Sequence, residues 1–334
     1  MDGNEKLVGA CKKDNPDVAV ISVSSSPHLK NISLTSRKMM LDVLIALLPV
    51  IFVSIYFFKW FAVKQMAICL ISVLAAEAIF TKIRQKDFSL FDLSAVITGL
   101  ILGLSLPGPA PWYVGVVASF VAIGIGKTIF GGFGMNIFNP AMVGRAFVMI
   151  AFPGIMAAAG YESAKAGVDV LSMATPLDAF KQSGVVPALS DLFWGLTNGS
   201  PGEVSAIASI AGGIYLCLRR TAAWEIPFGI ILAVAVLGLI CDLTGAASGW
   251  TFLHHLAGGA LLFGAFFIAT DPVTSPIAPK GRFIFGLGIG AMVMLLRIFS
   301  GYPEGVMFAV LLMNALTPLL NIVTIPKTLG EKIL

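Results

Sequence analysis

Charged side chains are scarce in this sequence of 334 residues: Asp, Glu, Lys and Arg together make up only 12% of it. Soluble domains carry about 25% charged residues, whereas 57% of this chain is hydrophobic. Apolar runs of about 18 residues or more, each long enough to cross a bilayer, recur along the chain. The composition excludes an ordinary soluble domain and indicates an all-α, polytopic protein of the lipid bilayer. A net charge of only +4 gives no reason to expect nucleic acid as a partner.

Cysteine and histidine are also scarce. The four cysteines, Cys11, Cys69, Cys217 and Cys241, show no paired spacing, so neither an iron–sulfur cluster nor another metal site is expected. Only three histidines are present and two of them are adjacent, which does not suit a haem held by histidines from two helices. Because dinucleotide and phosphate-loop motifs are missing too, the chain is not expected to be catalytic alone.

Hydropathy predicts ten membrane spans. They lie at residues 40–58, 62–81, 92–106, 112–131, 139–153, 203–218, 225–245, 252–269, 283–299 and 305–323. The chain then consists of a cytoplasmic segment 1–39, a first membrane repeat 40–153, an external loop 154–202, a second membrane repeat 203–323 and a cytoplasmic tail 324–334. Residues 1–38 contain no apolar h-region, so no cleavable signal peptide is expected.

The distribution of basic residues predicts the orientation. With both termini in the cytoplasm, fifteen of the 22 Lys and Arg residues fall in cytoplasmic segments. The positive-inside rule requires such a bias. The loop 154–202 is therefore expected outside the cytoplasm.

A recurring pattern suggests that the spans form two related halves. "LSLPGPAPW" (104–112) ends the third span and "IATDPVTSP" (268–276) ends the eighth, and a buried cation near several glycines follows each, first Lys127 and then Arg297. Five spans separate the copies, so the two halves must have opposite orientations. Inverted five-helix repeats with broken helices place a binding site near the midplane. Chance recurrence of Pro and Gly in a Gly-rich chain is the alternative.

The same stretches carry a family resemblance. In order, "SPH", "GKTIFGGFGMNIFNPAMVGRAF", "SMATPLDAF", "GAFFIATDPVTSP", "GRFIFG" and "LLRIFSGYPEGVMFAVLLMN" resemble RnfD, a membrane component of the Rnf electron-transport complex. They are similar, more distantly, to NqrB of the sodium-pumping NADH:quinone reductase. The resemblance covers roughly residues 24–325, and several motifs in one order are more specific than any one of them.

The resemblance implies a covalent flavin. In that family a threonine in an Asp-x-x-Ser/Thr-Gly-Ala-Thr segment carries FMN as a phosphoester; Asp169, Ser172 and Thr175 match its positions, and Met173 replaces the glycine. Pro176 biases Thr175 towards an extended backbone that can present its hydroxyl. Without the family, a Thr-Pro pair would indicate a turn or a helix N-cap. Attachment would also require an external flavin transferase as a partner.

The asparagines of "NIFNPA" form a second candidate site. In the reductase relative, asparagines of this motif contact a non-covalent riboflavin, and Asn136 and Asn139 match them. A carboxamide offers both a donor and an acceptor to the polar edge of an isoalloxazine ring. The alternative is that both asparagines cap a broken helix and satisfy backbone groups that lipid cannot.

Three cations within predicted spans complete the candidate cofactor residues: Lys127, Arg145 and Arg297. Ionisable groups in hydrocarbon are costly and are functional hypotheses by default, and a cation beside a reduced, anionic flavin would raise its potential. Their partners, or parts of an ion path, are sought among Asp42, Glu77, Asp92, Glu225 and Asp242. The alternative role is to tie down backbone carbonyls of broken helices.

The resemblance implies a flavin-carrying component of a redox-driven ion pump in the cytoplasmic (inner) membrane of a bacterium or archaeon. Electrons would pass between ferredoxin- and NAD-linked partners, the A, B, C, E and G subunits of an Rnf-type complex, coupled to Na⁺ or H⁺ translocation. A small-solute channel or transporter is the alternative, since inverted repeats with broken helices also describe those folds. A structural anchor of the complex is a third. A transporter, however, has no need of a flavin-attachment segment.

Overall fold

The computed structural model describes residues 36–85, 92–107, 110–157, 175–184, 186–197, 199–203, 205–245, 249–300 and 305–326. All regular structure within these residues is helical, as predicted. By length and apolar composition, four of the described helices can cross a bilayer: α2 (Ser36–Ile83), α10 (Glu225–Thr244), α13 (Pro279–Phe299) and α14 (Val306–Thr324). Shorter apolar helices accompany them: α3 (Ser94–Ser105), α4 (Trp112–Ile123) continued by η3 (Gly124–Thr128), α5 (Pro140–Ala151) and α9 (Ala206–Leu218). The described part of the chain therefore has the construction of a helical membrane protein.

Helix α2 consists of two helices in succession. A straight helix of its 48 residues would be about 72 Å long, more than twice the ~30 Å thickness of the hydrocarbon layer. At Lys59 the backbone leaves the helical region, with φ 50° and ψ −128°. The segments 36–58 and 60–83 on either side are each about 35 Å long. They correspond to the first two predicted spans.

Other predicted spans also differ from the structure, and α5 and α9, with 12 and 13 residues, are about as short as α3. The third, predicted at 92–106, is the 12-residue helix α3, which is about 18 Å long and does not by itself cross the hydrocarbon layer. The eighth, predicted as continuous over 252–269, is divided into α11 (Phe252–Ala257), α12 (Leu261–Phe263) and η4 (Gly264–Ile268). The division falls at two glycines, and Gly259 has a φ of 70°, which is incompatible with a continuing right-handed helix.

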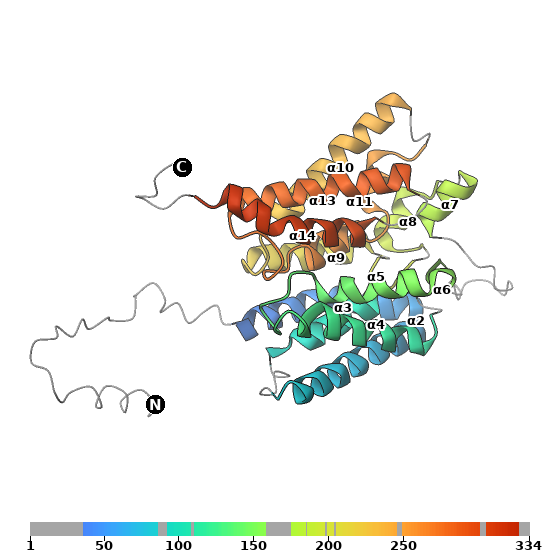
Figure 1. Ribbon diagram of the computed structural model, residues 1–334. Helices are drawn as coiled ribbons and strands as arrows, with labels where there is room; N and C mark the ends of the chain where they lie inside the picture. Colours follow the sequence, from blue (N-terminus) through green and yellow to red (C-terminus); the bar gives the residue numbers. More distant parts are fainter. Residues whose placement is uncertain are drawn as a thin grey trace, which may run out of the picture. The chain divides into compact units, whose positions relative to one another are not determined.

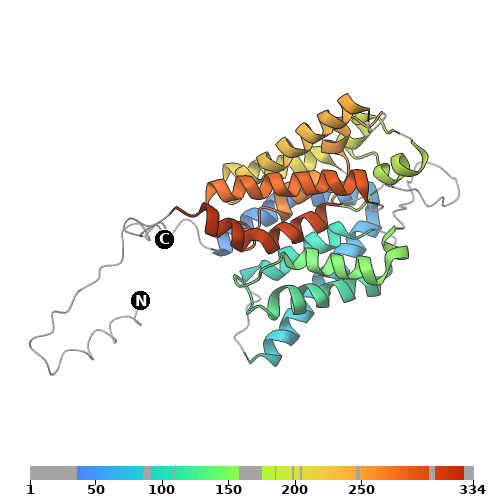
Figure 2. The same cartoon turned by 45° about the horizontal axis from the view of Figure 1, so that its top comes forward.

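We call Ser36–Ala151 the first half and Ala206–Thr324 the second half. In Figures 1 and 2 the helices α10, α13 and α14 lie side by side above the helices α3, α4 and α5. The halves meet where α2 packs against α9, and there Gly212 leaves room for the carbonyl oxygen of Ala46. Within the second half, Gly286 of α13 similarly faces the carbonyl of Ile226. Small residues at such crossings let helix backbones approach closely.

The two ends of this bundle differ. At one end α2 begins and α14 finishes (Figure 1). At the other end lie the short helices α6 (Pro153–Ala157), α7 (Pro176–Ser183) and α8 (Leu189–Trp194), of which α7 directly follows Thr175. We call these the α2-start end and the α7 end. The candidate flavin threonine is thus at the α7 end.

Candidate functional site

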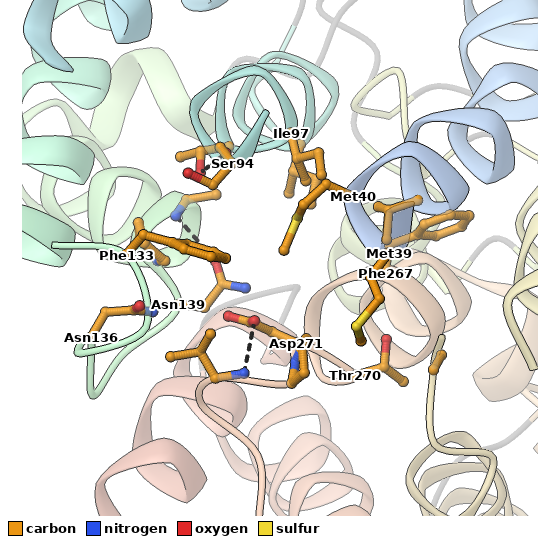
Figure 3. A pocket seen from close by; sticks show the side chains of 18 of the residues that line it. Met39, Met40, Ser94, Ile97, Phe133, Asn136, Asn139, Phe267, Thr270 and Asp271 are labelled. Carbon is orange, nitrogen blue, oxygen red and sulfur yellow. Dashed lines mark hydrogen bonds between the residues drawn. The ribbon is translucent and has the colours of Figure 1, made fainter. Parts of the chain in front are cut away.

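A pocket with a cavity volume of about 80 Å³, partly open to the surroundings, lies between the two halves near the α2-start end (Figure 3). This volume is below the ~300–1,000 Å³ that is typical of small-molecule sites. Its lining combines apolar side chains with a few polar ones: Met39, Met40, Val43, Ser94, Ile97, Thr98, Ile101, Lys127, Phe133, Asn136, Asn139, Pro140, Ala141, Leu216, Thr221, Ala222, Phe267, Thr270, Asp271, Pro272 and Val273. We call it the cross-half pocket, because both halves supply its walls.

Lys127 lines the cross-half pocket and forms a buried ion pair. Its Nζ donates to Glu77 Oε1 at 2.6 Å and to Ser94 Oγ at 2.7 Å, and it lies 5.8 Å from the centre of the Phe133 ring. Ser94 Oγ in turn donates to Asp92 Oδ1 at 2.7 Å. Glu77 was one of the carboxylates considered as partners from the sequence, and it is the partner of Lys127. The carboxylate offsets much of the positive charge that the lysine presents to the pocket.

A π-helical turn carries Lys127 to the pocket wall. In η3 the Ile129 N–H donates to the Gly124 carbonyl five residues back, at 3.1 Å, so the turn is wider than an α-helical one. Gly126 allows this turn to lie against the start of α5, since a Cβ there would be 2.8 Å from Pro140 Cα. The second π-helical turn, η4, supplies Phe267 to the same pocket. Single π turns inside helices are frequent at functional sites.

The two asparagines predicted to bind a flavin both line the pocket (Figure 3). Asn139 caps α5, because its Oδ1 accepts from the N–H of Ala141 at 3.1 Å and of Met142 at 3.4 Å. Its Nδ2 donates to the Ile268 carbonyl of the second half at 3.3 Å. Asn136 Nδ2 donates to the carbonyl of Phe138, two residues further along the chain, at 3.2 Å. The capping role foreseen as the alternative is therefore present for Asn139, at a residue that also faces the pocket.

Asp271 is a pocket residue that the sequence did not single out. Its carboxylate accepts from the Val273 N–H at 3.2 Å and from the Thr274 hydroxyl at 3.3 Å. Burial raises the pKa of Asp271 above its ordinary value, and these two hydrogen bonds oppose only part of the rise. The signal that could have found it is the Asp-Pro-x-Thr turn in "IATDPVTSP", directly after a predicted span.

The other two predicted cations are not among the residues that line the pocket. Arg145 of α5 pairs with Glu203, with 3.1 Å between Nη2 and Oε1. Arg297 of α13 donates to the carbonyls of His255 and Gly258, the latter at 2.8 Å, and so spans the break between α11 and α12. The structure thus brings Lys127, Asn136 and Asn139 together and leaves Arg145 and Arg297 elsewhere.

Thr175 directly precedes α7, and its carbonyl accepts from the Ala179 N–H at 2.8 Å. Its side chain is partly exposed. Helix N-termini attract phosphate groups, because unpaired N–H groups and the helix dipole favour negative charge there. Asp169 and Ser172, the other two residues of the predicted attachment segment, lie outside the described residues.

Known proteins are similar in sequence to nearly the whole chain. The sequence model of the NQR2, RnfD, RnfE family matches residues 22–330. The D subunit of the Na(+)-translocating ferredoxin:NAD(+) oxidoreductase complex of Acetobacterium woodii is 40% identical, over 90% of this chain and 92% of its own. The D subunit of the proton-translocating ferredoxin:NAD(+) oxidoreductase complex of Clostridium ljungdahlii is 39% identical, over 94% of this chain and 97% of its own. The D subunit of the ion-translocating oxidoreductase complex of Shewanella amazonensis is 37% identical, over 93% of this chain and 98% of its own.

Proposed function

The chain belongs to the NQR2, RnfD, RnfE family, and from this premise we propose that it is the RnfD component of an ion-translocating ferredoxin:NAD⁺ oxidoreductase complex of the Rnf type. The observation that carries the proposal is end-to-end similarity, at 37–40% identity, to proteins named as this component. The chain works with the A, B, C, E and G subunits, which supply the ferredoxin- and NAD-linked chemistry. Its ion is Na⁺ or H⁺, since relatives named for each are about equally similar.

Two inverted halves of five spans are the architecture that the packing supports. The second segment of α2 packs against α3 and α4 as α10 packs against α11 and α13, and α4 packs on α5 as α13 packs on α14. The first spans of the two halves, α2 and α9, meet each other, and so do the last, α5 and α14. Such pairing is typical of repeats related by an axis in the membrane plane, with the functional site between them.

The cross-half pocket is the proposed site of a non-covalent flavin, riboflavin. The chemistry of the lining suits an isoalloxazine ring: Phe133 and Phe267 offer apolar faces, and Asn136 offers a carboxamide to the ring edge. Bound there, the flavin would supply one-electron redox chemistry that the side chains lack. Lys127 would hold a positive charge near it, while Glu77 limits how strongly that charge acts.

Thr175 is the proposed attachment point of FMN through a phosphoester. Its position at the N-terminus of α7 suits a phosphate, and Pro176 favours an extended backbone at Thr175, which would present the hydroxyl. The distribution of basic residues supports a cytoplasmic α2-start end and an external α7 end. Attachment therefore depends on a flavin transferase outside the cytoplasm.

Flavin that survives denaturation tests this proposal. The wild-type chain, purified and run on a denaturing gel, is expected to fluoresce and to carry the mass of FMN less one water on the peptide that contains Thr175. Thr175→Ala removes the hydroxyl and should abolish both signals, whereas Thr175→Ser keeps a hydroxyl and should retain them. Thr197→Ala, in the same predicted external loop, is the matched control and should stay labelled. A fluorescent Thr175→Ala chain would contradict attachment at this residue.

A further inference from the structure

Helix α7 contacts the second half at two places, and both lie outside the cross-half pocket. The Phe180 ring lies against the Trp250 ring, with 4.8 Å between their centres and 35° between their planes. Lys181, the next residue, donates from Nζ to the Ser300 carbonyl just beyond the end of α13, at 2.8 Å. Two consecutive residues of α7 thus contact two different segments of the second half.

The chain after α7 is held at the same place. His254 Nε2 lies 3.2 Å from the Pro187 carbonyl, and His254 Nδ1 lies 3.3 Å from the Thr251 N–H. Since a backbone N–H can only donate, Nδ1 is the acceptor, and Nε2–H is the donor to Pro187 in the neutral ring. The His254 ring also lies 5.3 Å from the Trp250 ring. The contacts of α7 and of residues 186–188 therefore converge on Trp250 and α11.

Trp250 is the centre of this arrangement, and hydrogen bonding does not explain why it is a tryptophan. It is completely buried, and its Nε1–H has no acceptor among the described residues. A buried donor without an acceptor is costly, so the indole is retained at a penalty that phenylalanine would avoid. Its large flat face, which carries Phe180 and His254, is the feature that distinguishes it.

Thr175 lies one and a half helical turns before Phe180. Five residues at a rise of 1.5 Å place it about 8 Å along the helix axis from the ring that touches Trp250. A group linked to Thr175 therefore starts close to this contact, and tilting α7 at Phe180 would displace it. We call the contacts of Phe180 with Trp250, Lys181 with Ser300 and His254 with Pro187 the α7 clamp.

We propose that the α7 clamp is a positioning site, which holds the Thr175-linked flavin in one orientation against the α7 end of the second half. The proposal rests on the proposed attachment of flavin to Thr175. Trp250, Phe180 and Lys181 act through the backbone of α7 and need not touch the flavin. The clamp keeps the redox group at a fixed distance from the centres with which it exchanges electrons, and small misplacements of reacting groups are expensive in rate.

Flavin fluorescence anisotropy in the native, assembled complex tests the proposal. Trp250→Ala and Phe180→Ala should release the flavin: its anisotropy should fall by about half, and electron transfer through the complex should fall roughly tenfold or more. Trp250→Phe keeps an aromatic face and removes a donor that has no acceptor within the described ranges, so both quantities should stay within about twofold of wild type. Trp60→Ala is the matched control, because Trp60 is an exposed tryptophan of the first half.

The outcomes separate this inference from the proposed function. The fluorescence of covalently attached flavin on a denaturing gel should be as strong in every clamp variant as in the wild type. If the wild type shows no such fluorescence, the proposed attachment to Thr175 is itself overturned. Normal labelling with unchanged anisotropy in Trp250→Ala and Phe180→Ala would overturn the clamp alone. Should the alanine variants fail to assemble, Lys181→Met removes the Ser300 contact and leaves the ring contacts of the clamp, and its anisotropy must then fall partway. An unchanged value for Lys181→Met would also count against the clamp.

Discussion

Lys127 and Arg297 occupy comparable places in the two halves but have different partners. Each lies in the last turn of its helix, Lys127 in η3 at the end of α4 and Arg297 in α13. Each also contacts an earlier helix of its own half: Lys127 contacts Ser94 at the start of α3, and Arg297 contacts His255 in the last turn of α11. Lys127, however, pairs with a carboxylate, whereas Arg297 donates to backbone carbonyls.

The difference shows that a buried cation can serve an electrostatic or a structural role in the same architecture. In the first half, Glu77 of α2 faces the lysine, and the pair stands at the wall of the cross-half pocket. In the second half, α11 is broken at Gly258, and the planar guanidinium satisfies the carbonyls that the break exposes. We therefore expect substitutions of Lys127 to change redox behaviour and substitutions of Arg297 to change folding.

The largest effect on folding is expected for Arg297→Met. The variant keeps the apolar stem but leaves the His255 and Gly258 carbonyls without a charged donor, at a cost of about 1.5–3 kcal/mol for each. The free energy of unfolding should fall by roughly 3–5 kcal/mol, seen as poor assembly and an earlier thermal transition. Arg297→Lys can restore one of the two bonds and should recover part of the loss. Normal assembly of Arg297→Met would contradict the structural role.

The next effect is on electron transfer, for the double variant Lys127→Met, Glu77→Gln. Removing only the lysine would leave a buried, unpaired carboxylate, which typically costs about 3–5 kcal/mol. Replacing both charges by neutral groups is often nearly neutral for folding, so the complex should assemble. Its ferredoxin- and NAD-linked electron transfer should fall roughly tenfold, because this corresponds to about 1.4 kcal/mol of lost electrostatic stabilisation. An assembled double variant with wild-type turnover would remove the pair from the mechanism.

A smaller, pH-dependent effect is expected at Asp271, the carboxylate that the second half brings to the pocket. Its pKa is raised by burial, so the folded protein holds this proton more tightly than the unfolded chain. The stability from the neutral form is present below the ordinary pKa and is lost as the pH rises through the raised one. Asp271→Asn should remove that decline, so its stability relative to wild type should increase as the pH rises above the ordinary pKa range of aspartate. Thermal melts at increasing pH, with Asp191→Asn as a control, measure it; parallel curves would contradict the prediction.

The smallest effect on stability is expected for Asn139→Ser. Serine is an equally good N-cap, so the cap of α5 is kept, while the bond from Nδ2 to the Ile268 carbonyl is lost at a net cost of about 1 kcal/mol. If the amide also holds the pocket flavin, acid-extractable riboflavin should drop while assembly remains normal. Asn139→Ala, which loses the cap as well, should be less stable than Asn139→Ser. Unchanged riboflavin in Asn139→Ser would leave the residue with a capping role alone.

The sequence predicted the parts of this account that depend on composition. Hydropathy located the helices, and the cost of burying charge identified Lys127 and Arg297 as residues to explain. The interaction partners of these two cations were harder to predict, because they depend on backbone geometry. A π-helical turn places Lys127 at the pocket wall, and a break at glycine places backbone carbonyls within reach of Arg297. Asp271 escaped notice because the pocket that it lines is formed by two halves that are far apart in the sequence.

Redox titration of the complex that still assembles with either Lys127→Met or Glu77→Gln, despite the folding cost of a single substitution, tests the central claim most directly. A unit charge about 7 Å from a redox centre, at an effective dielectric constant of 20, is worth roughly 2.4 kcal/mol, or about 100 mV for one electron. Because the pair partner offsets part of this, shifts of tens of millivolts are expected. The midpoint of the pocket flavin should fall in Lys127→Met and rise in Glu77→Gln, and it should not move in Arg297→Lys. Shifts of the same sign in the first two variants, or no shift in either, would contradict a flavin beside the Lys127–Glu77 pair.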